Sequence, residues 1–112
     1  MELSNSIYSQ YAKETLREVV YESASGFVSV KFEEQALIIS DMFILPEQRR
    51  LGKATEFVTF CEQLARKNDK RYVFACAQYK APETIATLSL GAKLGYQLSH
   101  GNSEQIYICK EL

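Results

Sequence analysis

The chain has 112 residues and a formal net charge of −1, from 13 basic and 14 acidic side chains. Hydrophobic residues make up 46% of it and charged residues 24%, with five glycines and two prolines. This composition excludes a disordered or fibrous chain and predicts a single globular domain over residues 1–112. The near-neutral charge gives no general attraction to nucleic acid or to an anionic membrane, so we expect neither as a partner.

Three cysteines cannot all pair within one chain, and here they also lack the spacing of metal ligands. They are Cys61, Cys76 and Cys109. We therefore expect free thiols, no metal site and a cytoplasmic protein. The first residues lack a basic segment followed by an apolar one, and no run approaches the roughly 20 apolar residues of a membrane span. We expect neither secretion nor membrane insertion.

The N-terminal third predicts one helix and two strands. Apolar and aromatic residues at helical spacing predict a helix over about residues 6–20, with a cap among Ser4–Ser6. Two β-rich runs follow, at about Phe27–Phe32 and Leu37–Leu45, and the polar residues between them predict an antiparallel hairpin. The second run is more continuously apolar, which predicts a strand near the sheet centre.

The remaining chain alternates helical and strand patterns. Apolar residues at intervals of three and four predict a second helix over about residues 51–65. The run "RYVFACAQY" predicts a strand, and "APETIATLSLGAKLGY" predicts a helix that begins after a proline and ends near Gly95. The alternation in "QIYICKEL" predicts a last strand. The expected class is α+β, with an antiparallel hairpin leading into a parallel β-α-β crossover.

The stretch "ILPEQRRLGKATEF" has two interpretations. It can simply begin a helix, because Pro46 suits a first turn and Glu47 favours the positive helix N-terminus. It can also hold an anion, because a helix that follows a central strand presents free N–H groups, and Gly52 and Ala54 let a phosphate approach the backbone. The cations of this stretch are Arg49, Arg50 and Lys53.

The order of elements around this stretch favours the second interpretation. The pattern Arg49-x-x-Gly52-x-Ala54 resembles the acetyl-CoA signature of the GNAT superfamily of N-acetyltransferases, (Arg/Gln)-x-x-Gly-x-(Gly/Ala). The preceding "ALIISDMFIL" resembles the central strand of that family. The later "AKLGY" resembles the lysine-x-glycine-aromatic close of its last helix. The resemblance covers roughly residues 26–112 and implies a GNAT-like mixed sheet.

The resemblance also implies acetyl-CoA as the cofactor and a primary amine of a protein, peptide or small molecule as the acceptor. The backbone of Phe43, Ile44 and Leu45 would align the pantetheine arm, and Thr84 stands where the family often has a cofactor-facing asparagine. The pyrophosphate would lie on Arg49, Arg50, Leu51, Gly52, Lys53, Ala54 and Thr55.

The catalytic end matches the family less well. Asp41 is the carboxylate within the central strand, and it is either the base that deprotonates the amine or a polar residue paired with a nearby cation. The family's thiol-protonating tyrosine is replaced by Gly91, for which Tyr79 or Ser89 could substitute. Two functions follow: an N-acetyltransferase, or a degenerate module that binds acyl-CoA or a protein partner without transfer.

The N-terminal region is shorter than the resemblance implies. One predicted helix precedes the hairpin, where the family has a strand and further helical structure. A missing strand would leave Phe27–Phe32 at an edge of the sheet, which suggests homodimerisation as a hypothesis. His100, the only histidine, lies in "SHGNS" and is expected in a solvated loop.

Overall fold

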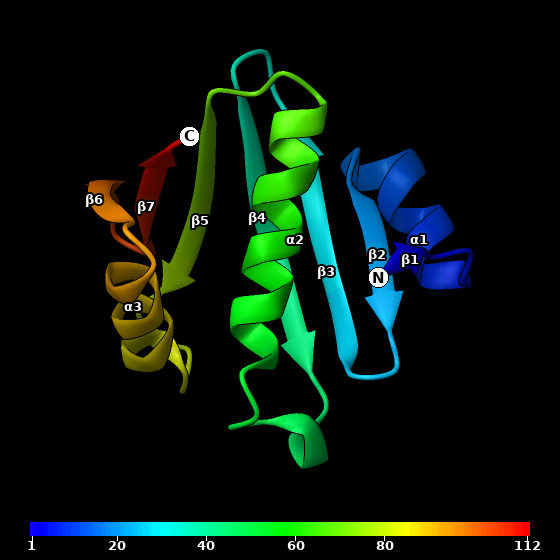
Figure 1. The fold of residues 1–112 in the computed structure, drawn as a ribbon, viewed down its shortest axis with the longest axis horizontal. Helices are drawn as coiled ribbons and strands as arrows, with labels where there is room; N and C mark the ends of the chain where they lie inside the picture. The colour runs from blue at the N-terminus through cyan, green and yellow to red at the C-terminus, as the bar shows by residue number, and fades with distance from the viewer.

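A computed structural model describes residues Met1–Leu112 and shows one seven-stranded sheet with helices on both of its faces (Figure 1). The strand order is β1-β2-β3-β4-β5-β7-β6, and every neighbouring pair is antiparallel except β4 and β5. The predicted α+β class, the hairpin and the parallel crossover are confirmed. None of the helices combines the length and the apolar character that a membrane span needs.

The elements have these bounds. The strands are β1 (Glu2–Leu3), β2 (Val19–Ser23), β3 (Gly26–Phe32), β4 (Ala36–Ile44), β5 (Tyr72–Gln78), β6 (Gln97–Gly101) and β7 (Gln105–Glu111). The helices are α1 (Ile7–Tyr11), a π-helical turn η1 (Ala12–Leu16), a 3₁₀ turn η2 (Pro46–Gln48), α2 (Lys53–Lys67) and α3 (Thr84–Lys93). The run that looked like a central strand is β4, which lies in the middle of the sheet.

The first helix is shorter than predicted. Ser6 caps it by accepting a hydrogen bond from Ser9 N at 3.1 Å, as its position suggested. The helical turns end at Arg17, whose φ of 57° is left-handed. Val19 and Val20 then pair with β3 as part of a strand that the sequence pattern had assigned to the helix. Pairing with β3 determines the conformation of these two residues, because β-branched side chains fit a pleated sheet better than a helix end.

The strand thought to be missing is therefore present. β2 pairs with β3 along its whole length, and β1 pairs with β2. The expectation that β3 forms an edge was wrong. The homodimer hypothesis rested on that edge and therefore has no remaining support.

The prediction that His100 lies in a loop was also wrong. It lies in β6, paired with Tyr107 of β7, and the two rings stack with their centroids 4.5 Å apart. All five residues of β6 are exposed, so the strand lacks the alternation of apolar and polar residues that sequence patterns detect. Its neighbour β7 supplies the pairing that makes it a strand.

The two faces of the sheet are covered differently (Figure 1). α2 and α3 cover one face, where Leu37, Phe57 and Val73 belong to a continuous buried core. α1 and η1 cover only part of the other face, and Tyr8 of α1 lies over Phe27 of β3 with ring centroids 6.1 Å apart. The half of this face formed by β4, β5, β7 and β6 has no helix over it.

The first residue of β3 must be glycine. Gly26 has φ +156°, and a Cβ there would overlap Phe43 O of the neighbouring strand. We expect Gly26→Ala to lower the free energy of unfolding by more than about 2 kcal/mol, because backbone cannot move aside as a side chain can. Gly101→Ala is the control, since its Cβ would lie 3.0 Å from the end of the Tyr79 side chain and 3.3 Å from its nearest backbone atom, Gln105 O, against 1.9 Å from Phe43 O for Gly26. Urea unfolding of the two variants checks this, and equal losses would contradict it.

Cys61 of α2 makes the fold sensitive to alkaline pH. Burial, followed by the charge of Glu62, raises the pKa of the Cys61 thiol from 9.0 to about 12. The native thiol stays neutral while the unfolded one ionises, so this stabilisation is complete below pH 9 and is lost towards pH 12. We expect Cys61→Ala to flatten the decline by up to about 1.4 kcal/mol per pH unit. Parallel curves for wild type and variant in urea titrations would rule this out.

Candidate active site

The site begins where β4 and β5 part. They pair from Ala36 with Tyr72 to Ile39 with Ala75, and no pairs follow, although β4 continues to Ile44 and β5 to Gln78. The register between β3 and β4 shifts at the same level. Such a bulge leaves one residue unopposed and bends the strand. The bend of β4 opens a cleft in the middle of the sheet.

Backbone groups of β4 face this cleft. Leu45 N donates to Ser25 O at 2.8 Å, so the backbone of Leu45 points towards β3. Because backbone direction alternates along an antiparallel strand, Phe43 also points to β3, whereas Met42 and Ile44 point towards β5. Ile44 O accepts a bond from Arg49 Nε at 2.9 Å, in agreement with this alternation. The free edge of the cleft is thus formed by Met42 and Ile44.

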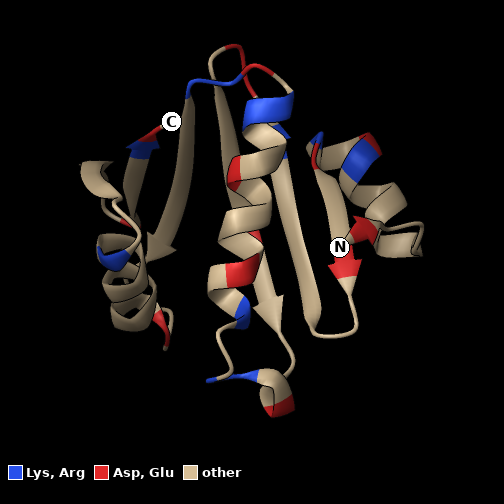
Figure 2. Ribbon diagram, in the orientation of Figure 1, with Lys and Arg blue, Asp and Glu red and all other residues tan.

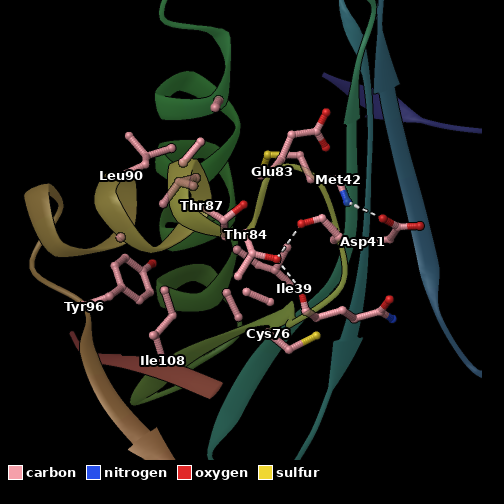
Figure 3. Close-up of a pocket in the computed structure, with 18 of the residues that line it drawn as sticks. Ile39, Asp41, Met42, Cys76, Glu83, Thr84, Thr87, Leu90, Tyr96 and Ile108 are labelled. Carbon is pink, nitrogen blue, oxygen red and sulfur yellow. Dashed lines mark hydrogen bonds between the residues drawn. The ribbon is translucent and has the colours of Figure 1, made fainter. Parts of the chain in front are cut away.

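A cavity of about 590 Å³ fills the cleft (Figure 3). Its wall comes from β4 and β5 and from the facing sides of α2 and α3. Apolar side chains such as Val58, Leu90 and Ile108 form most of this wall. The lining residues with polar side chains are Ser40, Asp41, Arg49, Cys76, Gln78, Glu83, Thr84, Thr87 and Tyr96. A deep apolar cleft with a few polar groups is typical of a ligand site.

The loop between β4 and α2 forms one end of the site. After the 3₁₀ turn, Arg50 has φ 64° and Gly52 has φ 77°, so the chain makes two left-handed steps before α2 begins at Lys53. The first bond of this helix runs from Glu56 N to Gly52 O at 3.1 Å. The preceding three N–H groups, those of residues 53–55, consequently have no helical partner and suit an anion.

The loop also carries cations (Figure 2). The Arg49 guanidinium lies 5.7 Å from the Phe43 ring centroid and 3.7 Å from a carboxylate oxygen of Glu83 at the start of α3. Lys53 Nζ is 3.2 Å from a carboxylate oxygen of Glu56. Arg50 is exposed and forms no ion pair within 4.0 Å. Arg50 is therefore the one cation of this loop without an acidic partner, and it lies three residues before the start of α2 at Lys53.

Asp41 stands at the point where the strands part (Figure 3). Its carboxylate is exposed and accepts a bond from Met42 N at 2.9 Å, on the edge of β4 that faces the cleft. Ser29, its neighbour on β3, is fully buried and donates to Glu18 Oε1 at 2.8 Å. Burial, then Asp41 and Glu18, raises the pKa of the Cys76 thiol on β5. The centre of the cleft is therefore acidic and holds a neutral thiol.

The residues considered as proton donors lie elsewhere. Gly91 lines the cavity, and a Cβ there would overlap Ile108 Cδ1, so a larger residue at this position would require the end of the Ile108 side chain on β7 to move. Tyr79 lies against Gly101 of β6, and Ser89 is exposed on α3; neither lines the cavity. The Thr84 hydroxyl donates to Ala81 O at 2.9 Å and lies close to Gln78 O, so it is occupied within the chain.

Tyr96 lines the cavity but belongs to a buried network. Its hydroxyl donates to Glu62 Oε2 at 2.8 Å, and Lys110 Nζ lies 3.2 Å from both oxygens of the same carboxylate. Burial, then the bond to Glu62, raises the pKa of Tyr96 well above its usual range. This phenol is a poor proton donor at neutral pH, and the network instead joins α2 to β7.

The residues predicted from the sequence fall into two groups. Asp41, Phe43, Ile44, Arg49, Ala54 and Thr84 line the cavity. Leu45, Arg50, Leu51, Gly52, Lys53 and Thr55 do not line it and lie on the chain between β4 and the first turn of α2. Sequence analysis missed Cys76, Glu83 and Thr87. Thr87 could have been predicted from the sequence, because it follows Thr84 by three residues and shares its helix face.

Comparisons with known proteins agree on the fold. No protein-family model matches the sequence, and no curated protein matches it. The chain superimposes on nourseothricin acetyltransferase with a TM-score of 0.69 at 15% identity, covering 84% of this chain and 64% of that one. It thus spans slightly less than two thirds of that relative.

Two further structures contain coenzyme A or acetyl-CoA. PaiA N-acetyltransferase from Thermoplasma acidophilum, in complex with coenzyme A, gives a TM-score of 0.74 at 10% identity, covering 95% of this chain and 69% of that one. A GNAT family acetyltransferase from Elizabethkingia anophelis with acetyl-CoA bound gives 0.75 at 12%, covering 97% and 84%. The resemblance drawn from the sequence is confirmed at the level of the fold.

Proposed function

We propose that this chain, which has the fold of the GNAT acetyltransferases, is an N-acetyltransferase that transfers an acetyl group from acetyl-CoA to a primary amine. The observation that carries the proposal is the parting of β4 from β5 beside a loop that presents free N–H groups. A parted parallel pair leaves polar backbone without partners, which would be costly unless a ligand completes it. The cavity between the two strands provides room for that ligand.

The residues present fit coenzyme A. The N–H groups of Lys53, Ala54 and Thr55 suit its pyrophosphate, and nothing lies within 4 Å of a Cβ built on Gly52, so the approach to them is open. Met42 N already donates to Asp41 and Ile44 O accepts from Arg49, so Met42 O and Ile44 N are the cleft-facing groups that suit the amides of the pantetheine arm. When bound, acetyl-CoA supplies the activated acyl group. Arg49 and Arg50 add the charge and planar geometry that favour phosphate.

We assign Asp41 as the base. An acceptor amine must lose a proton to attack a carbonyl carbon, and a carboxylate within hydrogen-bond reach, directly or through water, can take it. Asp41 meets this need because it is exposed at the junction of the cleft and the opposite sheet face. Its bond from Met42 N orients the carboxylate towards the parting of the strands.

One observation favours a second function. Neither Thr84 nor Tyr96 is free to protonate a departing thiolate, since Thr84 bonds to carbonyl oxygens and Tyr96 to Glu62, which leaves only the hydroxyls of Ser40 and Thr87 in the lining. A module that binds acyl-CoA or a protein partner without transfer would need no such group. Solvent protonation of the thiolate would remove this need in an enzyme as well, so we favour the enzyme.

Two measurements test the proposal. Calorimetric titration with acetyl-CoA and with CoA should show binding of both, and no detectable binding would sink the proposed cofactor site. Release of free thiol from acetyl-CoA in the presence of a panel of primary amines should follow. Binding without amine-dependent thiol release would favour the non-catalytic module.

A further inference from the structure

A second cavity adjoins the first on the opposite face of the sheet. Its volume is about 490 Å³, and its lining residues are Ser6, Tyr8, Val20, Glu22, Phe27 and Asp41. Asp41 lines both cavities, so the proposed base stands between them. α1 forms the outer wall, and the sheet face of β2, β3 and β4 forms the floor. A molecule in this second cavity would reach the proposed transfer point from the side opposite α2.

The walls of this cavity suit an organic cation. Tyr8 and Phe27 place aromatic rings in the lining with their centroids 6.1 Å apart, and Phe27 in turn stacks on Phe43 at 6.1 Å. Glu22 and Asp41 supply carboxylates at two separate points of the lining. Aromatic faces and carboxylates both attract alkylammonium groups, and the rings also accommodate the carbon chain between two such groups.

The negative charge around the cavity is not neutralised within the chain. Glu22 lies directly opposite Glu2 across the β1–β2 pair (Figure 2), an arrangement that repels. Glu18, held by buried Ser29, adds a further carboxylate near Asp41. None of these four carboxylates takes part in an ion pair within 4.0 Å. Burial and the charges of Asp41 and Glu18 raise the pKa of Tyr8, as expected beside uncompensated negative charge.

The two lining carboxylates are separated by a definite span. Glu22 is on β2 and Asp41 on β4, and Asp41 pairs through Ser29 with Val20, two residues from Glu22. Strand spacing and rise place their Cα atoms about 12 Å apart. A linear chain with an amine at each end can place one amine at Asp41 and the other at Glu22.

We propose that this second cavity is the acceptor subsite and that it selects linear aliphatic diamines. The inference rests on the proposed function, because it names the substrate class of that transfer. The acceptor arrives with both amines protonated. At Asp41 the reacting ammonium loses one proton to the carboxylate and then to solvent, and its nitrogen attacks the thioester carbonyl carbon. The C–S bond breaks, the second proton of that nitrogen ends on the sulfur through solvent, and the products are the monoacetylated diamine and CoA. The distal ammonium stays charged beside Glu22.

Three acceptors of equal length test the selection. We expect kcat/KM to fall from hexane-1,6-diamine to n-hexylamine to 6-aminohexanoate, because the distal group changes from cationic to neutral to anionic. Glu22→Gln should lower kcat/KM for the diamine by about fivefold and leave n-hexylamine unchanged, as for the loss of one exposed charge contact. Glu14→Gln, an exposed carboxylate of η1 outside the lining, is the matched control.

The outcomes separate this inference from the proposed function. Equal rates for the three acceptors, or an equal loss for diamine and hexylamine in Glu22→Gln, would overturn the diamine subsite and leave the acetyltransferase intact. Binding of acetyl-CoA with none of the three amines acetylated would also overturn the subsite. Failure to bind acetyl-CoA at all would remove the proposed function and the subsite together.

Discussion

Gly52→Glu is expected to weaken acetyl-CoA and CoA binding by about 100-fold or more, because it places a carboxylate beside the free N–H groups that would hold the pyrophosphate. The position is open, since nothing lies within 4 Å of a Cβ built there. The new side chain would therefore occupy the approach to the loop rather than the core, and its charge would repel the phosphates. Calorimetric titration of the folded variant measures the loss.

Two controls separate charge from backbone strain. Gly52→Ala adds no charge to the loop, but the alanine must adopt φ +77°, which costs an L-residue about 1 kcal/mol. It should lower stability slightly and affinity little. Thr59→Glu adds the same charge to an exposed position on α2, away from the cavity lining, and should leave affinity unchanged. Wild-type affinity in Gly52→Glu would show that the cofactor does not lie on this loop.

Asp41→Asn is expected to lower kcat by about 100- to 1,000-fold while the Kd for acetyl-CoA stays within a factor of about two, because general-base catalysis contributes in that range. An asparagine oxygen can still accept the bond from Met42 N that Asp41 accepts at 2.9 Å, so the strand geometry is retained. What the variant loses is the capacity to take a proton. Amine-dependent thiol release and calorimetry, run on one preparation, measure the two quantities.

A matched change elsewhere defines the background. Asp69→Asn removes the same charge at a turn beyond α2, where φ is 58°, a conformation that asparagine tolerates. It should leave both kcat and Kd unchanged. If Asp41→Asn behaves like Asp69→Asn, Asp41 is not the base. If it instead weakens acetyl-CoA binding in proportion to turnover, the carboxylate acts through the shape of the cleft.

The elements whose burial follows their own sequence pattern were predicted well, and the elements that depend on pairing with a neighbour were not. The interval pattern of α2 and the apolar run of β4 identified both elements, because each is buried in the way its period implies. β2 and β6 were missed for opposite reasons. Val19 fits a helical interval equally well, and β6 has no buried face at all. Both owe their strand conformation to hydrogen bonds with a neighbour distant in sequence, which no local window contains.

The sequence by itself predicted the loop that forms the proposed cofactor end of the site. Gly52, Ala54 and the cations around them lie within six consecutive residues, and a strand followed by a helix is enough to orient their backbone. The conformation of such a loop depends on residues close together in the sequence. Its composition and its position between two periodic segments therefore predict its form. The resemblance to the GNAT family rested on these residues, and the observed fold agrees with it.

Only the tertiary structure brought together the residues of the proposed catalytic and acceptor ends. Glu18, Glu22 and Asp41 come from different strands or their flanks and are brought near one another by pairing with β3. The parting of β4 from β5 depends on a bulge and on a crossover through α2, and the loss of room at Gly91 depends on its contact with Ile108. These features result from contacts between residues that are far apart in the sequence. Local propensity and spacing do not encode them, because each arises only when separate segments meet in the folded sheet.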